Sequence, residues 1–169
     1  MKRIFINFLD LEENHFLNFS GIDSALAVYP PENVFQTSKA QNVLDFIQDI
    51  NTNEEPLLIS FFAHGGRMGI ASKLVYVAEE KLLYTDLVTA LNHSKTNYPL
   101  ILNLTAICHS YCIEQFVTPG GNNQIWCTTD ETMSIHNSIR ASSHGDFERF
   151  KMELPNELYD LYFKLLYQL

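Results

Sequence analysis

The sequence contains few of the residues that mark several large classes of protein. Its 169 residues include three cysteines, an odd number far below the density of a disulfide scaffold. We therefore expect a reducing compartment and a cytoplasmic location. Glycine (7) and proline (6) are too scarce for a fibrous or disordered chain. No apolar run approaches the roughly 18 residues that a membrane-spanning helix needs.

Positive charge is also scarce. Lys and Arg number 11 against 20 Asp and Glu, which leaves a formal net charge of −9. This charge repels phosphate backbones and anionic lipid surfaces, so we expect neither nucleic acid nor a membrane as a partner. A charged substrate is attracted more readily if it is basic. The apolar run from Ile4 to Leu9 ends at Asp10, too early for a signal peptide.

Apolar residues, in contrast, make up 46% of the chain. They are spread along its length without an internal repeat, a low-complexity tract or a linker, so residues 1–169 are expected to form one domain. Short apolar runs, typical of buried strands, alternate with segments in which apolar residues have helical spacing. This alternation predicts an α/β fold, in which a predominantly parallel sheet of about five or six strands has helices on both faces.

Short apolar runs bounded by polar or turn-forming residues predict the strands. The expected strands are Lys2–Leu9, Leu26–Tyr29, Leu57–Ala63, Leu100–Ile107 and Gln124–Thr128, with a hairpin over Met68–Val77. Between them we expect a surface loop over Asp10–Asp23, a strand stop at Pro30-Pro31 and a turn over Pro119–Asn122, while Ile135–His144 has no clear period.

Apolar residues three and four positions apart predict the helices. One helix is expected from Ser38, a second capped by Thr85 or Asp86, a short one after Cys108 through Phe116, and a last one from Pro155. The residues that indicate these faces are Val43, Phe46, Ile47 and Ile50, then Leu87, Val88 and Leu91, and finally Leu158, Leu161, Tyr162 and Leu165. The last helix is apolar enough to dock a partner or a second copy of the chain.

Two chemically active side chains follow consecutive buried strands. His64 ends one run and Cys108 ends the next. Because ligands and chemistry gather at the carboxyl ends of parallel strands, imidazole and thiol are expected to face one crevice. A free thiol is mostly protonated at neutral pH, and a neighbouring imidazole can take that proton to give the nucleophilic thiolate. Taken singly, such a cysteine is more often a small buried apolar residue.

Glycine after the histidine adds to this pattern. Without a side chain at Gly65, the backbone N–H there can approach a substrate carbonyl and contribute to an oxyanion hole. No Gly-x-Ser-x-Gly elbow and no phosphate-binding glycine loop occurs in the sequence. The strand ends at His64 and Cys108 are therefore the strongest candidates for a site.

These blocks carry a resemblance. Segments 59–66 (ISFFAHGG) and 100–110 (LILNLTAICHS) resemble the two catalytic blocks of caspase-like cysteine peptidases, most closely those of the bacterial CHAT-domain branch. Segment 125–130 (IWCTTD) is similar to the next strand of separase-like members, which carry a Trp and then an acidic residue. The resemblance extends over about residues 56 to 132, with the flanks matching only in the order of elements.

The resemblance implies a set of roles. Cys108 is then the nucleophile, His64 the general base and acid, and the backbone N–H groups of Gly65 and Cys108 hold the oxyanion. Asp130, or its neighbour Glu131, selects a basic residue on the N-terminal side of the cut. The family implies an endopeptidase of protein or peptide substrates that needs no cofactor or metal, is activated by a partner protein, and serves bacterial stress response or antiviral defence.

Other interpretations start from the same residues. A bulky Ile107 before Cys108, Ser110 in place of a glycine, and the lack of a third residue to orient His64 favour an inactive caspase-like scaffold that binds other proteins. Cys108, His109 and Cys112 also suggest a zinc site, but paired Cys or His spacings are missing for its further ligands, which would be His136, His144, Cys127 or His64. His136, Ser138 and His144 are expected on the surface. A small-molecule-binding domain would need a large apolar pocket.

Overall fold

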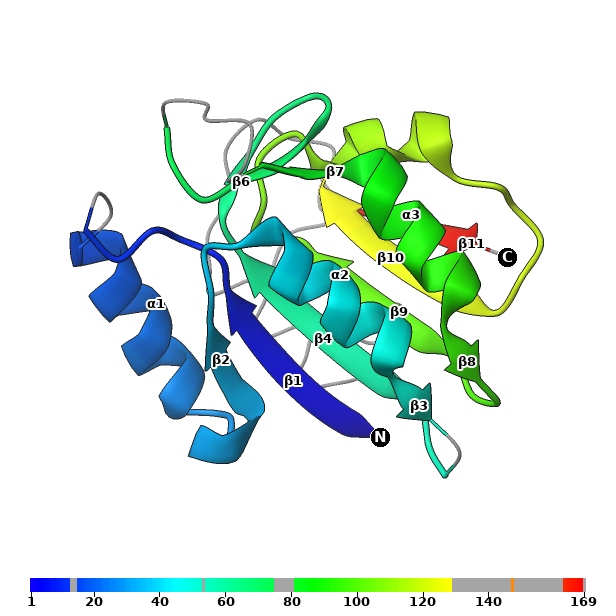
Figure 1. Ribbon diagram of the computed structural model, residues 1–169, viewed down its shortest axis with the longest axis horizontal. Helices are drawn as coiled ribbons and strands as arrows, with labels where there is room; N and C mark the ends of the chain where they lie inside the picture. The colour runs from blue at the N-terminus through cyan, green and yellow to red at the C-terminus, as the bar shows by residue number, and fades with distance from the viewer. Residues whose placement is uncertain (13–14, 53, 75–80, 129–146, 148–162, 169) are drawn as a thin grey trace.

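The computed structural model describes residues 1–12, 15–52, 54–74, 81–128, 147 and 163–168. Six strands in these ranges form the main sheet, in the order β11-β10-β9-β4-β1-β2 (Figure 1). Neighbouring strands are parallel except for the edge strand β11, which is antiparallel to β10. The predicted α/β class with a mostly parallel sheet is therefore confirmed. The strands are β1 (Lys2–Asn7), β2 (Val34–Gln36), β4 (Leu57–Phe62), β9 (Leu100–Leu104), β10 (Asn123–Thr128) and β11 (Phe163–Gln168).

The two central strands, β4 and β9, are the most deeply buried. All five residues of β9 and the first five of β4 are buried, because both faces of the sheet are covered at this point. Their register pairs Ile59 with Leu102 and Ser60 with Asn103. The sequence predicted both strands, although β9 ends at Leu104 and not at Ile107.

Helices α2 (Ala40–Asp49) and α3 (Tyr84–His93) cover one face of the sheet. Val43 and Ile47 of α2 pack with strand residues of the apolar core, as their i, i+4 spacing predicted. The expected cap at Thr85 or Asp86 is wrong, because α3 begins at Tyr84 with Leu83 at the cap position and no side-chain cap. The Tyr84 N–H instead donates to the Met68 carbonyl, so the preceding hairpin satisfies one free donor of the helix.

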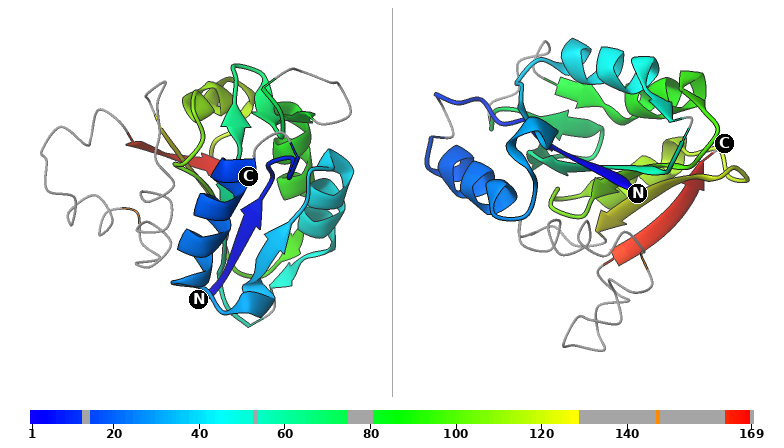
Figure 2. Two further views of the ribbon diagram at one scale, coloured as in Figure 1. Left: turned by 90° about the vertical axis from the view of Figure 1, so that its left-hand side faces the viewer. Right: turned by 90° about the horizontal axis from the view of Figure 1, so that it is seen from below.

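Helix α1 (His15–Leu26) covers the opposite face beside β1 and β2 (Figure 2). The predicted loop over Asp10–Asp23 is wrong from His15 onward, although Asp10–Glu12 are irregular as predicted, and the predicted strand over Leu26–Tyr29 is wrong because Leu26 ends the helix and no strand follows in the described residues before Val34. The helix buries small residues four positions apart, Gly21 and Ala25, and such residues give little hydrophobic periodicity. After it, Tyr29 packs on Phe5.

The edge strand lies later in the chain than expected. Pro31 opens a 3₁₀ turn, η1 (Pro31–Asn33), because its fixed φ suits the first position of a helix. The chain then enters β2, which pairs with β1 from Phe5 to Asn7. The proline pair therefore starts a turn and does not end a strand.

The C-terminal helix is also a wrong prediction where the structure describes the chain. Residues Phe163–Gln168 form β11, whose pairing with β10 over six residues outweighs the local helical spacing. Residues 155–162 of the expected helix lie outside the described residues. An association of two copies through a C-terminal helix therefore has no basis over Phe163–Gln168.

Short elements complete the two ends of the sheet. At the carboxyl end, β5 (His64–Gly65), β6 (Gly69–Ala71) and β7 (Lys81–Leu83) form a three-stranded antiparallel sheet. The expected hairpin over Met68–Val77 is thus a strand only at Gly69–Ala71, and residues 75–77 lie outside the described residues. At the amino end, β3 (Asn51–Thr52) pairs with β8 (Lys95–Thr96). The expected turn over Pro119–Asn122 contains Gly120 at a φ of 119°.

Candidate active site

Two segments meet at one edge of the sheet: the His64 turn, which follows β4 and includes β5, and the Cys108 turn, residues 105–109 after β9. The two strands are direct parallel neighbours, so their carboxyl ends lie side by side. His64 follows β4 after a single residue, and Cys108 lies in the turn after β9. The structure therefore brings together the two segments that the sequence analysis selected.

Gly65 lies directly against the backbone of Cys108. A Cβ atom added to Gly65 would be 1.8 Å from the carbonyl oxygen of Cys108 and 2.6 Å from Cγ2 of Ile107. No side chain fits into such a space. Glycine is therefore required here by the close approach of the two turns, a role that was not predicted from the sequence.

The exposure of the side chains separates the cysteines. Cys108 and Cys112 are half-buried free thiols, whereas Cys127 in β10 is buried. Burial raises the pKa of the Cys127 thiol from 9.0 to about 12, and its Sγ donates to the Lys164 carbonyl at 3.5 Å. Since His64 is also half-buried, the pair of Cys108 and His64 is reachable from solvent and Cys127 is not.

The backbone after Cys108 makes a tight turn. His109 has a φ of 59° and a ψ of 15°, the left-handed conformation that non-glycine residues rarely adopt. Its Nδ1 atom is buried without a hydrogen-bond partner. The short helix expected through Phe116 follows as a 3₁₀ helix, η3 (Ser110–Phe116). Such local strain recurs at functional sites.

The start of η3 is fixed to the next strand. The buried hydroxyl of Ser110 accepts a hydrogen bond from the Thr128 N–H at 2.9 Å. At the other end of η3, Glu114 forms an ion pair with Lys164 of β11. The turn that carries Cys108 is therefore anchored on β10 and β11 as well as on Gly65.

A buried tyrosine lies between the two turns. The Tyr84 hydroxyl is 3.0 Å from the Gly66 carbonyl, two residues after His64, and 3.5 Å from the His109 carbonyl, directly after Cys108. Sequence analysis missed Tyr84, because nothing in its surroundings indicates that α3 begins there. The one available signal is general: a buried tyrosine hydroxyl usually finds a partner.

A second polar group supports the site from the opposite face of the sheet. Asn103 donates to Ser60 Oγ at 3.0 Å, and Tyr29 donates to the same oxygen at 3.2 Å. Asn103 Oδ1 accepts from the Thr105 N–H at 3.2 Å and from its hydroxyl at 2.6 Å. All four side chains are buried. This network links β4 to β9 and holds the first residue of the turn toward Cys108.

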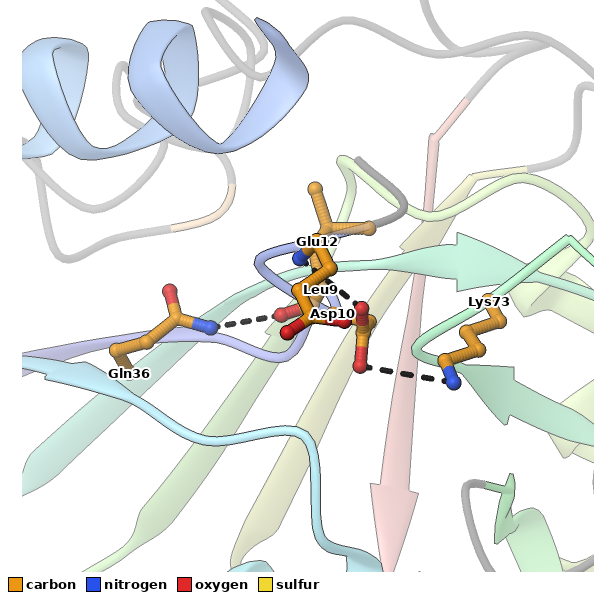
Figure 3. Close-up of polar contacts among 5 residues, drawn as sticks. All are labelled: Leu9, Asp10, Glu12, Gln36 and Lys73. Atoms are coloured by element: carbon orange, nitrogen blue, oxygen red, sulfur yellow. Dashed lines mark hydrogen bonds and ion pairs between the residues drawn. The ribbon is translucent and has the colours of Figure 1, made fainter. Parts of the chain in front are cut away.

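The carboxyl end of β1 contributes polar residues to the same edge (Figure 3). Asp10 accepts a hydrogen bond from the Glu12 N–H at 3.1 Å and lies 3.8 Å from Lys73 Nζ, while Gln36 donates to the Leu9 carbonyl at 2.7 Å. The Asp10 N–H donates to the Ser72 carbonyl just after β6. An open, polar cleft of about 400 Å³ begins at Asp10 and extends to Asn42 in α2. This edge therefore has a hollow beside the hairpin that carries His64.

The structure describes only some of the other candidate residues. Asp130, Glu131, His136, Ser138 and His144 lie outside the described residues, so their predicted roles stay predictions. Cys112 packs against the apolar core, as expected for a residue on a helix over the sheet. Within the described ranges, His, Cys, Asp and Glu side chains do not gather in threes in an arrangement that could hold a metal ion.

Comparisons with known proteins leave the site to be interpreted from its own chemistry. Neither the models of known protein families nor the curated protein sequences give a match to the chain. In the part of the chain that the structure describes, the helices are all too short or too polar to cross a lipid bilayer.

Proposed function

We propose that the chain is a cysteine endopeptidase of the caspase-like, CHAT-related type, with Cys108 as nucleophile and His64 as general base and acid. One observation carries the proposal: the two turns that follow the neighbouring parallel strands β4 and β9 touch, with Gly65 against the Cys108 backbone. The half-buried state of both side chains supports it, because a substrate must reach them.

The chemistry follows from these two groups. His64 takes the thiol proton of Cys108, and the resulting thiolate attacks the carbonyl carbon of the scissile peptide bond. The tetrahedral intermediate collapses when the imidazolium of His64 returns the proton to the leaving amine. A thioester to Cys108 remains. Water, deprotonated by His64, then attacks that thioester and releases the acid product and the free thiol.

The negative charge on the carbonyl oxygen needs donors. In this proposal they are the backbone N–H groups of Gly65 and Cys108, which belong to segments in direct contact. The net charge of −9 favours substrates with a basic residue before the cut, selected by Asp130 or Glu131. An activating partner protein and a role in bacterial defence or stress are part of the same proposal.

An inactive scaffold that binds other proteins is the second candidate. The observation that favours it is the bulk of Ile107, which is buried in the core directly before Cys108 and lies against Gly65. The Ile107 side chain narrows the space beside the Gly65 backbone. A scaffold would retain the fold and lose the activated thiol.

Thiol reactivity distinguishes the two candidates without a known substrate or activator. The native chain is treated with iodoacetamide at pH 7, and alkylation of each cysteine is followed by mass spectrometry. We expect Cys108 to react about tenfold faster than the half-buried Cys112, since an unperturbed thiol is only a few per cent ionised at this pH. We expect His64→Ala to remove most of this advantage.

The control substitutes a histidine that is distant from both turns in the sequence. His93 is exposed at the end of α3, where it bonds the Thr89 carbonyl, so His93→Ala should leave the Cys108 rate unchanged. If Cys108 reacts no faster than Cys112 and is indifferent to His64→Ala, the peptidase proposal fails and the scaffold is favoured.

A further inference from the structure

Tyr84 contacts both turns of the candidate site through two groups, its N–H and its hydroxyl, which make three contacts. Its N–H donates to the Met68 carbonyl at 3.0 Å, and its hydroxyl lies 3.0 Å from the Gly66 carbonyl and 3.5 Å from the His109 carbonyl. The side chain is fully buried at the start of α3. A single residue of the helix layer therefore fixes the segments that follow His64 and Cys108.

The hydroxyl has one proton for two carbonyl acceptors. The 3.0 Å distance marks Gly66 as its main acceptor, and the longer distance marks His109 as the weaker partner of a shared bond. Gly66 also opens the tight turn that its N–H closes on the Gly69 carbonyl at 2.9 Å. Fixing the Gly66 carbonyl thus fixes the orientation of the turn directly after His64 and Gly65.

The acceptor on the other turn belongs to the strained residue. His109 has a left-handed backbone, which costs free energy unless neighbouring groups hold it. The Tyr84 hydroxyl on its carbonyl is one such group. Two further groups are the Cys112 N–H, which donates to the same carbonyl at 3.0 Å, and Ser110, which is held by the Thr128 N–H. Cys108 lies directly before this pair of anchored residues.

We infer that Tyr84 is a positioning residue that holds the His64 turn and the Cys108 turn in register through one shared hydroxyl. The inference rests on the proposed function, since it assigns Tyr84 to the activation of Cys108 by His64. The Tyr84 hydroxyl sets the relative placement of the two backbones, and with it the distance over which the proton of Cys108 moves to His64.

The test compares two buried tyrosines whose hydroxyl groups donate hydrogen bonds on opposite sides of the sheet. Tyr84→Phe removes the hydroxyl between the turns, and Tyr29→Phe removes the one on Ser60. Alkylation of Cys108 by iodoacetamide is measured from pH 5 to pH 9 for the full chain and both variants, with Cys112 as the internal reference. Thermal unfolding of each variant is recorded alongside.

We expect Tyr84→Phe to slow Cys108 alkylation about three- to tenfold at pH 7 and to move the midpoint of its pH profile upward, because one hydrogen bond is lost. We expect Tyr29→Phe to lower the thermal unfolding temperature about as much as Tyr84→Phe does, and to slow Cys108 alkylation less than Tyr84→Phe, because its hydroxyl bonds Ser60 within β4. Placing 4-aminophenylalanine at position 84, which restores a donor at the same place, should recover most of the rate.

The outcomes separate this inference from the proposed function. If His64→Ala slows Cys108 and Tyr84→Phe does not, the positioning role is overturned and the dyad stands. If His64→Ala has no effect, the proposed function fails and the role of Tyr84 fails with it. If Tyr84→Phe does not fold, 4-fluorophenylalanine, which nearly keeps the size of the side chain but has no donor, takes its place at position 84: a reduced Cys108 rate supports the inference, and an unchanged rate overturns it.

Discussion

The strands β4 and β9 are held together differently along their length and beyond their ends. Along their paired residues, Leu57–Ser60 and Leu100–Asn103, every side chain is buried, and three apolar pairs are followed by one polar pair. Beyond the ends, the turns are held by a few individual contacts: Gly65 on Cys108, and the Tyr84 hydroxyl on two carbonyls. The same two segments are thus held by close side-chain packing along the strands and by a few individual contacts beyond the strand ends.

This difference shows which substitutions each region tolerates. A packed interior depends on total volume and polarity, so side chains of similar size can replace one another at modest cost. The contact between Gly65 and the Cys108 backbone has no such freedom, because a Cβ atom at position 65 would lie 1.8 Å from the Cys108 carbonyl oxygen. The candidate site lies in the second region, where single atoms decide the geometry.

The largest effect is expected from Gly65→Ala. The new methyl group would overlap the Cys108 carbonyl, so the two turns must separate, at a cost of about 3 kcal/mol or more in unfolding free energy. Urea unfolding measures this loss, and alkylation of Cys108 at pH 7 should fall toward the rate of Cys112.

The matched change in the interior is Ile59→Val. It removes one methylene from β4 and should cost about 0.5–1.5 kcal/mol while leaving the Cys108 rate unchanged. Equal losses for Gly65→Ala and Ile59→Val would show that the two regions do not differ in tolerance.

An intermediate effect is expected where the two regions join. Asn103→Ala removes the buried hydrogen bonds to Ser60 and Thr105, of which Ser60 keeps only the one from Tyr29 among those described, and this should lower the unfolding free energy by about 1–3 kcal/mol. Because Asn103 also bonds the Thr105 N–H, the turn toward Cys108 should loosen as well.

A double-mutant cycle with Ser60→Ala sharpens this prediction. The two residues share a hydrogen bond, so the double variant should lose less than the sum of the single losses, by about 0.5 kcal/mol or more. Strict additivity would argue against a connected network.

The smallest effect is expected in the interior, at alkaline pH. Burial raises the pKa of Cys127 from 9.0 to about 12, so the folded chain keeps this proton where the unfolded chain loses it. The stabilisation is complete below pH 9 and is lost as the pH rises from 9 toward 12. At pH 10 the loss should be about 1 kcal/mol.

Cys127→Ala isolates this contribution. The variant lacks the thiol, so its unfolding free energy should fall less steeply than that of the wild type between pH 9 and pH 11. Parallel curves for the two proteins would contradict a buried, protonated Cys127.

Most of the sheet and part of the helix layer could be predicted from the sequence, because their signals are local. The continuous apolar runs at Leu57 and Leu100 and the i, i+4 pair Val43 and Ile47 are visible without neighbours. Helix α1 and strand β11 could not be predicted, since the first buries small residues and the second depends on pairing with β10, about forty residues earlier in the chain.

The candidate site divides in the same way. His64, Gly65 and Cys108 could be selected from the sequence, because a histidine, a glycine and a cysteine after consecutive buried strands form a chemical pattern in their own right. Tyr84 and Asn103 could not, because their roles consist entirely of what their polar atoms reach in the folded chain.

The amino-acid sequence by itself determined the class of fold, the two central strands and the residues at their ends, because burial and periodicity act over a few neighbouring positions. Only the tertiary structure decided that β4 and β9 are adjacent, that Gly65 meets the Cys108 backbone, and that Tyr84 lies between the two turns. These contacts join residues far apart in the chain, and their geometry depends on how the whole sheet and its helices pack.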